Sequence, residues 1–366
     1  MRILYVTTVG ATMSFFKDFI RQLVNEGHTV DIATNEVGYP ISPIYRELGC
    51  QVHHIDTSRS PFSFGNIKAV KQIKKIVSVG GYDLVHCHTP IAAACTRIAC
   101  RGVRKRGVRV LYTAHGFHFY KGAPKKNWLI FYPVEKLCAR MTDVIITINR
   151  EDFDLARRKL KAKRVEYIPG VGIEPERFLP TEKSALKRSE IGVPEGAKML
   201  LSVGELNKNK NHEKVIRAIA ELGKDDVHYV IAGKGDLADE LTGLARDLGI
   251  AERVHILGYR EDVAELYGAA DLFVHPSYRE GLPVAVIEAM AAGLPVVASR
   301  IRGNVDLIDE EGGRLVCPCN VRGFAEAIDT VLSNTDMSEK MGAHNREVAK
   351  NYSTDAVSEL LLKLYE

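Results

Sequence analysis

Two successive series of short apolar segments alternate with helical patterns along this 366-residue chain, and this alternation limits the fold more than any other feature. The first series runs from residues 3–7 to 165–167, and the second runs from 198–203 to 313–316. Strands that alternate with helices predict parallel sheets covered on both faces. A chain of this length also exceeds what one hydrophobic core usually serves. We therefore predict an α/β chain with two doubly wound, Rossmann-like domains.

A Pro/Gly cluster at residues 168–172, Ile-Pro-Gly-Val-Gly, marks the expected boundary between the two series. We predict an N-terminal domain at 1–172 and a C-terminal domain at 173–352, followed by an amphipathic helix at 353–366. Ligands of doubly wound sheets bind beyond the carboxyl ends of the strands. We therefore expect a central cleft that is faced by the functional loops of both domains.

The hydrophobic periodicity also sets the individual elements. In the first domain we expect strands at 3–7, 29–34, 52–55, 84–88, 108–113, 144–148 and 165–167, and helices that include 15–26, 41–48 and 66–79. In the second we expect strands at 198–203, 227–232, 254–257, 272–275, 295–299 and 313–316, and helices at 211–222, 237–248, 263–270 and 283–292. Ser14 is the expected N-cap of the first helix and Gly27 its stop.

The net charge of +4 conceals a strong asymmetry between the two halves. Residues 1–179 hold 28 Lys and Arg against 15 Asp and Glu, whereas residues 180–366 hold 22 against 31. A basic half favours an anionic partner, such as a phosphorylated substrate or a membrane surface. Nucleic acid is not expected, because the basic runs are not interleaved with a platform of stacking aromatic residues.

The composition, with 46% hydrophobic and 26% charged residues, is that of an ordinary globular protein. The chain lacks a run of eighteen apolar residues and a signal-peptide pattern, which predicts a cytoplasmic protein. Most of the seven cysteines lie in apolar segments and are expected to be buried. Cys317 and Cys319 are too close for the usual zinc spacing, so we expect no metal there.

The segment from His275 to Glu288 carries the clearest functional pattern. Glu280 and Glu288 flank seven residues that include Gly281, Leu282, Pro283 and Val284. A Gly-Leu-Pro loop that leads into a helix presents free backbone N–H groups and the positive end of the helix dipole. Such a helix start is suited to bind an anion. Carboxylates beside it are suited to bind sugar hydroxyls, which together indicates a nucleotide-sugar site.

This segment resembles the Glu-seven-residues-Glu signature of the retaining family-4 glycosyltransferases, which have the GT-B fold. The resemblance implies that Glu288 binds the ribose hydroxyls and Glu280 those of the transferred sugar. It also implies that the backbone of Gly281, Leu282 and Val284 binds phosphate, whereas Pro283 has no N–H to donate.

The loop Gly204-Glu-Leu-Asn-Lys-Asn-Lys-Asn211 resembles a second family motif, Gly-Arg-Leu followed by three residues and Lys-Gly. Lys210 matches the family's phosphate-binding lysine. Glu205 stands in place of the arginine, so Lys208 is a candidate to supply the missing charge. The Gly233-Lys-Gly-Asp236 turn resembles the family's Gly-x-Gly turn, whose glycines allow either close packing or the approach of a nucleotide. By the same resemblance, Tyr259 and Arg260 are candidates to line the nucleobase pocket.

In the first half, His115 follows a predicted strand and matches a family histidine that reaches the donor sugar; His118 is a weaker candidate. His86 and His88 alternate on one strand and so point the same way. A metal pair there lacks a third ligand, and the resemblance implies that the enzyme needs no metal and no cofactor. Gly10, in the first strand–helix loop, is expected on the acceptor side.

Together the motifs predict a hexosyltransferase-type glycosyltransferase that moves a sugar from an NDP-sugar, most simply a UDP-sugar. The expected acceptor is a saccharide, plausibly lipid-linked, in bacterial capsule, exopolysaccharide or O-antigen synthesis, at the inner face of the plasma membrane. The alternatives are a nucleotide-sugar 2-epimerase and a non-catalytic nucleotide-sugar-binding protein. A nicotinamide-dependent oxidoreductase is disfavoured, since residues 8–14 do not match Gly-x-Gly-x-x-Gly.

Overall fold

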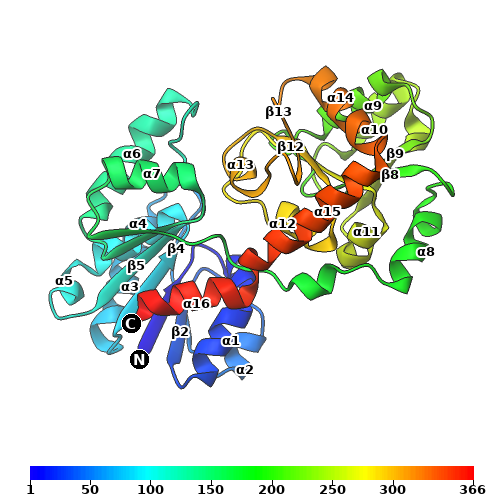
Figure 1. The fold of residues 1–366 in the computed structure, drawn as a ribbon. Coiled ribbons are helices and arrows are strands. Elements are labelled where there is room, and N and C mark those ends of the chain that lie inside the picture. Colours follow the sequence, from blue (N-terminus) through cyan, green and yellow to red (C-terminus); the bar gives the residue numbers. More distant parts are fainter. The chain divides into compact units, whose positions relative to one another are not determined.

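The computed structural model describes all residues from 1 to 366. The chain forms two compact units (Figure 1). The N-terminal unit contains Met1–Val171 and Val357–Glu366, and the C-terminal unit contains Gly172–Ala356.

The N-terminal unit is built on a seven-stranded sheet with the order β3-β2-β1-β4-β5-β6-β7. All of its strand pairs are parallel. Its strands are β1 (Arg2–Val6), β2 (Thr29–Thr34), β3 (Val52–His54), β4 (Leu84–His88), β5 (Arg109–Ala114), β6 (Val144–Thr147) and β7 (Arg164–Tyr167). The strand order reverses between β1 and β4, and loops at such a switch point are where ligands of this fold bind.

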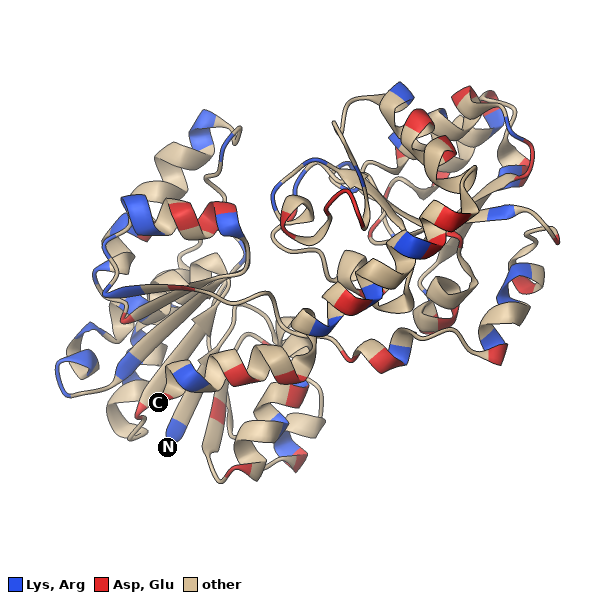
Figure 2. Ribbon diagram, in the orientation of Figure 1, with Lys and Arg blue, Asp and Glu red and all other residues tan.

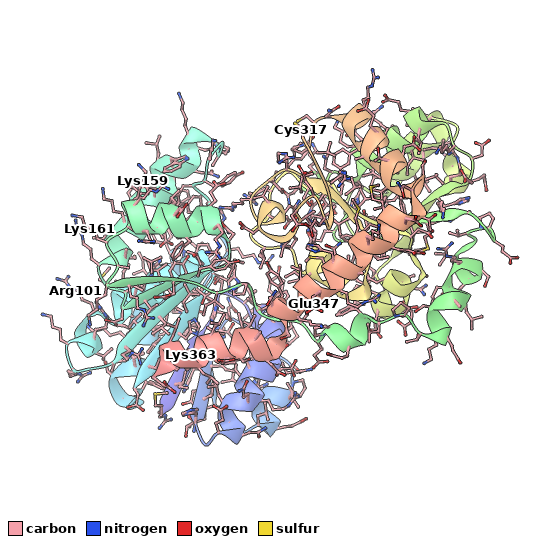
Figure 3. All side chains as sticks on the ribbon, viewed as in Figure 1. Arg101, Lys159, Lys161, Cys317, Glu347 and Lys363 are labelled. Atoms are coloured by element: carbon pink, nitrogen blue, oxygen red, sulfur yellow. The ribbon has the colours of Figure 1, made fainter.

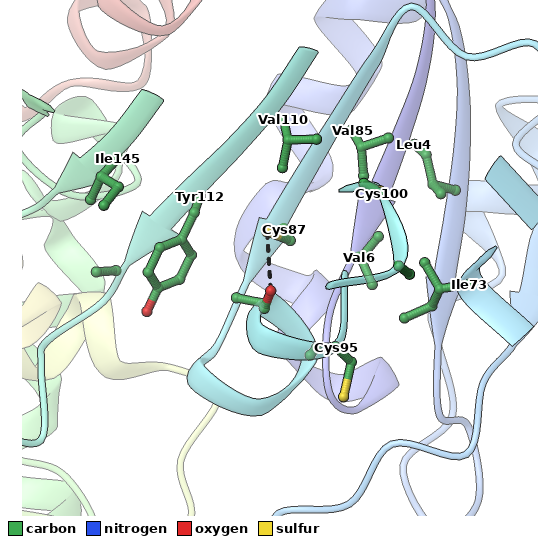
Figure 4. Packing of buried hydrophobic residues seen from close by; sticks show 14 of the residues in the cluster. Leu4, Val6, Ile73, Val85, Cys87, Cys95, Cys100, Val110, Tyr112 and Ile145 are labelled. Atoms are coloured by element: carbon green, nitrogen blue, oxygen red, sulfur yellow. Dashed lines mark hydrogen bonds between the residues drawn. The ribbon is translucent and has the colours of Figure 1, made fainter. Parts of the chain in front are cut away.

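Helices cover both faces of this sheet, which is why its strands are apolar on both sides. They are η1 (Gly10–Phe16), α1 (Lys17–Asn25), α2 (Ile44–Glu47), α3 (Gly65–Val79), α4 (Pro90–Ala99), α5 (Arg101–Arg104), α6 (Lys125–Ala139) and α7 (Arg150–Lys159), together with the terminal α16 (Thr354–Tyr365). One core includes Leu4, Val85 and Tyr112 packed against Ile73 and Cys95 (Figure 4). The other core packs α1 and α16 against the opposite face.

The C-terminal unit has a six-stranded parallel sheet with the order β10-β9-β8-β11-β12-β13. Its strands are β8 (Lys198–Val203), β9 (Val227–Ala232), β10 (Val254–Gly258), β11 (Leu272–His275), β12 (Val296–Ser299) and β13 (Gly313–Val316). Its helices are η2 (Pro175–Phe178), α8 (Glu182–Ile191), α9 (His212–Leu222), α10 (Ala238–Asp247), η3 (Ala251–Arg253), α11 (Val263–Ala269), α12 (Val284–Ala292), α13 (Asn304–Leu307), α14 (Val321–Leu332), α15 (Thr335–Ala349) and η4 (Lys350–Tyr352). Here the switch point lies between β8 and β11.

The α/β prediction is confirmed, and six predicted strands have the observed bounds. The predicted helix at 15–26 was wrong at its start, because residues 10–16 form a 3₁₀ turn and the α-helix begins at Lys17. Ser14 is therefore not an N-cap; its hydroxyl donates to the carbonyl of Ala11 at 2.9 Å. Gly27 ends that helix with φ of +84°. The helix predicted at 41–48 is a single turn, Ile44–Glu47.

Candidate active site

Two loops at the switch point of the C-terminal sheet are bonded to each other. The first, residues 204–211, links β8 to α9, and the second, residues 276–283, links β11 to α12. The Asn209 carbonyl accepts from the N–H of Tyr278 at 2.8 Å, and its side chain donates to the Arg279 carbonyl at 2.9 Å. Asn211, which has a left-handed φ of +58°, donates to the Pro276 carbonyl at 2.9 Å. These bonds bring the two predicted motifs into one site.

Lys210 and Glu280 form an ion pair at the centre of this site. The Lys210 Nζ lies 2.8 Å from Oε1 of Glu280, and both side chains are mostly buried. His275 Nε2 lies 3.3 Å from the same oxygen. Burial acts to raise the pKa of Glu280, but the hydrogen bond and charge of His275, together with Lys210, outweigh it and lower the pKa to about 2. The carboxylate is thus fully ionised at neutral pH. It is paired with the Lys210 ammonium, which a phosphate would need as its own partner.

Glu288 lies in the second turn of α12, which begins within the same loop. Its carboxylate accepts from the Tyr267 hydroxyl at 2.9 Å. Burial raises the pKa of Glu288, while the Tyr267 hydrogen bond and the charge of Arg177 act in the opposite direction. No side chain caps the start of α12, and Pro283 occupies the N-cap position instead of the predicted first turn. The uncapped N–H groups therefore remain able to meet an anion.

Glycines allow three loops to come close together here. Gly204 has φ of +157°, and a Cβ on it would lie 3.2 Å from Cε of Lys210. Gly303 has φ of +81°, and a Cβ there would lie 2.4 Å from the carbonyl oxygen of Gly281. The neighbouring Arg302 donates from Nε to the Glu280 carbonyl at 2.9 Å. The 300–304 loop thus supports the phosphate-binding segment from behind.

Three predicted site residues have other surroundings. Lys208 is exposed, as is Glu205, whose carboxylate accepts from the Asn207 amide at 2.7 Å. Tyr259 is 66% exposed, with Lys234 lying 5.5 Å from its ring. Arg260 is bonded to Asp262 and Glu190, so its charge is already neutralised. The glutamate at 205 leaves the site unobstructed because its side chain is turned to solvent.

In the N-terminal unit, His115 is part of a histidine cluster at the ends of β4 and β5. Its Nε2 lies 3.2 Å from Nδ1 of His88. Burial lowers the pKa of His115 to about 4, so the ring is neutral at pH 7. His86 is bonded through both ring nitrogens, to the Tyr365 hydroxyl at 2.6 Å and to Thr113 at 2.8 Å. With both nitrogens occupied, His86 has none left to bind a metal.

A pocket of about 340 Å³ opens beside this cluster, between the first strand–helix loop and α6. Its lining is Thr8, Val9, Thr12, Arg59, Thr89, Pro90, Ile91, His118 and Phe131. Gly10 packs at the back of the same loop, since a Cβ on it would lie 2.3 Å from the Tyr39 carbonyl oxygen. Thr89 holds a left-handed φ of +63° and its hydroxyl lies 2.6 Å from that of Thr8. The pocket thus combines hydroxyls, a cation and an aromatic ring.

Comparisons with known proteins identify the family of this chain. The model of "Glycosyl transferases group 1" matches residues 183–348, and that of "Glycosyl transferase 4-like" matches residues 2–149. The provisionally named glycosyltransferase EpsD of Bacillus subtilis is 36% identical over 360 residues, covering 92% of this chain and 94% of its own. The chain belongs to the group 1 glycosyltransferases. The predicted enzyme class is thereby confirmed.

One further relative and two solved structures are also similar to this chain. An Escherichia coli UDP-Gal:α-D-GlcNAc-diphosphoundecaprenol α-1,3-galactosyltransferase is 30% identical, covering 81% of each chain. The structure of Anabaena HepE in complex with UDP superimposes with a TM-score of 0.84 at 19% identity, covering 100% of this chain and 99% of that chain. The lipopolysaccharide glycosyltransferase WaaG gives a TM-score of 0.75 at 19% identity, covering 99% of each chain. These structures confirm the predicted GT-B fold.

In this glycosyltransferase the positions of the basic residues and the burial of the cysteines agree with what the sequence predicts. Lysines and arginines predominate on the outer helices of the N-terminal unit (Figure 2), where Arg101, Lys159 and Lys161 extend into solvent (Figure 3). Five cysteines are buried, whereas Cys317 and Cys319 are exposed and free. No helix is long and apolar enough to span a bilayer.

Sequence reasoning gave no role to three supporting residues of the site. His275 is the first residue of the recognised segment and the last of β11, and a polar residue that ends a buried strand was a usable signal. Arg302 follows β12 and could have been found in the same way. Tyr267, on α11, gave no signal, because its contact with Glu288 depends on how two helices pack.

Proposed function

We propose that this enzyme is a retaining glycosyltransferase whose donor, a UDP-sugar, binds to the C-terminal unit. The observation that supports this is the clustering of Lys210, Glu280 and Glu288 around the uncapped start of α12. A diphosphate needs cations and N–H donors, and the ribose and sugar need carboxylates that accept hydrogen bonds. The site offers these groups within one pair of loops. The UDP named in the HepE structure is consistent with this donor.

The chemistry that we propose is electrostatic. As the bond between the sugar and the diphosphate breaks, negative charge develops on the leaving phosphate. Lys210 and the N–H groups of residues 281–284 would stabilise that charge. Because these groups provide the positive charge, the reaction is proposed to need neither a metal nor another cofactor. Equal rates with EDTA and with magnesium would support this, and strict magnesium dependence would refute it.

The proposed acceptor is a saccharide, carried on a lipid, that binds to the N-terminal unit. The 340 Å³ pocket has threonine hydroxyls for a sugar, Arg59 for a phosphate and Phe131 for stacking. The excess of basic residues in this unit favours an anionic acceptor and an anionic membrane surface. One curated relative is named for a diphosphoundecaprenol-linked acceptor. We therefore propose a role in bacterial surface polysaccharide synthesis, at the cytoplasmic face of the membrane.

Calorimetric titration with UDP and GDP, with NAD as a control, tests the donor site. We expect micromolar binding of UDP that is lost in Glu288→Ala and little binding of NAD. Binding of GDP instead would change the donor base but keep the transferase. Binding that is unaffected by Glu288→Ala would refute the site.

A second assay separates transfer from epimerisation. Each UDP-sugar is incubated with the enzyme alone and with a lipid-linked saccharide acceptor, and products are followed by NMR. A glycosidic product with the donor's anomeric configuration supports a retaining transferase. An epimer formed without acceptor identifies a 2-epimerase instead, and an inverted linkage would refute retention.

A further inference from the structure

Helix α6, Lys125–Ala139, is apolar on both faces, unlike an ordinary surface helix. On its inner face Ala139 belongs to the core, and Trp128, Phe131 and Tyr132 pack against it. Its only acidic residue, Glu135, is 5% exposed and faces the core. There its carboxylate accepts two hydrogen bonds, of 2.8 and 3.0 Å, from the guanidinium of the fully buried Arg97, which makes a bidentate ion pair. The guanidinium of Arg97 also lies over the Tyr112 ring. The polar group of this helix has thus been drawn inward and neutralised.

The opposite face of α6 presents apolar side chains to solvent. Leu129 is 77% exposed, Leu137 57%, Val134 44% and Ile130 36%. Ile130, Val134 and Leu137 are spaced by four and three residues and so form one stripe along the helix, and Leu129 lies beside its N-terminal end. A continuous stripe of aliphatic residues on the surface of a globular unit marks an interaction site. Figure 1 shows α6 as an outer element of this unit.

Basic residues border this stripe at both ends, and no acid lies on it. Lys125 and Lys126 are exposed at the start of α6, and Arg140 is exposed just past its end. The Lys136 ammonium lies over the Tyr132 ring. A flexible lysine side chain in this position can extend its ammonium toward solvent. An apolar stripe between cations fits a surface that is apolar inside and anionic at its border. An anionic bilayer has this arrangement, whereas an acidic protein would offer charge without the apolar depth.

The loop of residues 59–64, which lines the same pocket as α6, also exposes apolar side chains. Phe62 is 77% exposed and Phe64 87% exposed. Arg59, at the start of this loop, and Phe131 of α6 both line the 340 Å³ pocket. The pocket is therefore lined by one residue of each of the two segments that expose apolar side chains. A headgroup carried on a lipid could enter it without leaving the bilayer.

We propose that α6, with the 59–64 loop beside it, seats the N-terminal unit in the interface of an anionic membrane. The aliphatic stripe enters the headgroup boundary, and the lysines and Arg140 contact lipid phosphates. This rests on the proposed function, because it gives the lipid-linked acceptor its route to the pocket.

The test is sedimentation of the full chain with vesicles of phosphatidylcholine alone and of phosphatidylcholine mixed with phosphatidylglycerol. We expect binding to the mixed vesicles. The triple variant Leu129→Gln/Val134→Gln/Leu137→Gln should lower binding about tenfold or more, since three aliphatic groups leave the membrane. Lys125→Gln/Lys126→Gln should lower binding only to the anionic vesicles, by about fivefold for each charge removed. Leu186→Gln, which changes a 68% exposed leucine of α8, is the matched control and should bind like wild type.

A second readout locates the contact. Trp128, in α6, is the only tryptophan of the chain. Lipids with brominated acyl chains should therefore quench the fluorescence of α6 alone, and the triple variant should escape quenching. Quenching that is equal in the triple variant would overturn the assignment to α6.

Further measurements keep the two proposals apart. All variants should keep the wild-type circular dichroism and UDP affinity, because the substituted side chains lie outside the donor site. Wild type that transfers sugar but does not bind anionic vesicles would overturn the membrane surface and leave the function intact. Vesicle binding without UDP binding would overturn the proposed function and leave the membrane surface intact. A dimer that the triple variant dissociates, with no vesicle binding, would mean that a second copy covers the stripe.

Discussion

Replacing Glu280 with glutamine should strengthen the binding of UDP while it weakens sugar transfer. In the unliganded site Glu280 holds the ammonium of Lys210 at 2.8 Å, so a diphosphate must displace a carboxylate before it can use that cation. Glutamine keeps the size of the side chain and one acceptor oxygen, but it carries no negative charge and so removes this competition. It also loses the charge proposed to bind the hydroxyls of the transferred sugar, so turnover should fall.

The magnitude follows from the pKa of Glu280. Its lowering from 4.5 to about 2 corresponds to about 3.5 kcal/mol of net stabilisation of the carboxylate, at about 1.4 kcal/mol per pKa unit. His275 and Lys210 provide this stabilisation against the opposing effect of burial, and His275 contributes the larger part. If Lys210 supplies somewhat less than half, a phosphate recovers about 1.5 kcal/mol when the carboxylate is absent, which is roughly a tenfold gain in UDP affinity.

Calorimetric titration of UDP into wild type, Glu280→Gln, Lys210→Met and the double variant measures this effect. The gain should appear in Glu280→Gln and vanish when Lys210 is also replaced, because the competition needs both groups. UDP affinity that falls or stays constant in Glu280→Gln would show that the diphosphate does not use Lys210. A gain that persists in the double variant would show that Glu280 acts on UDP by another route.

Four further outcomes are expected. Glu288→Ala should weaken UDP binding by about ten- to a hundredfold, since a hydrogen bond to a charged group contributes about 1.5–3 kcal/mol. Because burial raises the pKa of Glu288, wild-type UDP affinity should fall as the pH drops through that pKa, whereas Glu288→Gln should give a flat profile; a decline shared by both would point to another group. The free energy of unfolding should show the opposite pH dependence. Because the pKa of Glu288 is raised in the folded state, its contribution to stability is present at low pH and is lost as the pH rises through that folded-state pKa. Arg97→Met should cost about 3–5 kcal/mol in urea unfolding because Glu135 stays buried without its cation, and Arg97→Met/Glu135→Leu should recover most of it. Gly303→Ala should destabilise by about 1–2 kcal/mol for its left-handed φ and should also weaken UDP binding; unchanged values of both would exclude close packing on Gly281.

The parts of this structure that depend on local periodicity could be predicted from the sequence. Buried parallel strands such as Val227–Ala232 are largely apolar runs, so their bounds were found without tertiary information. The loop of Lys210 and the segment of Glu280 were predictable as motifs because each follows such a strand. Their neighbouring strand ends then bring them together.

Features that arise from packing between elements could not be predicted in this way. The 3₁₀ turn at Gly10–Phe16 buries Met13 and Phe16, and this burial depends on neighbouring elements that local periodicity does not describe. The ion pair between Lys210 and Glu280 joins residues seventy positions apart, and the motifs gave no sign that one would neutralise the other. The exposed stripe of α6 was also hidden, since an apolar periodicity in a sequence does not say which face is covered.

The last ten residues of the chain belong to the N-terminal unit, although all of the C-terminal unit precedes them. The Tyr365 hydroxyl lies 2.6 Å from the Tyr5 hydroxyl and 2.6 Å from Nδ1 of His86. The Arg109 guanidinium donates to the carbonyls of Leu364 and Tyr365. The polypeptide therefore passes between the two units twice. A chimera that exchanges the N-terminal unit with that of a relative must carry both segments from the same parent, and a stop codon late in the gene would damage the first half of the protein.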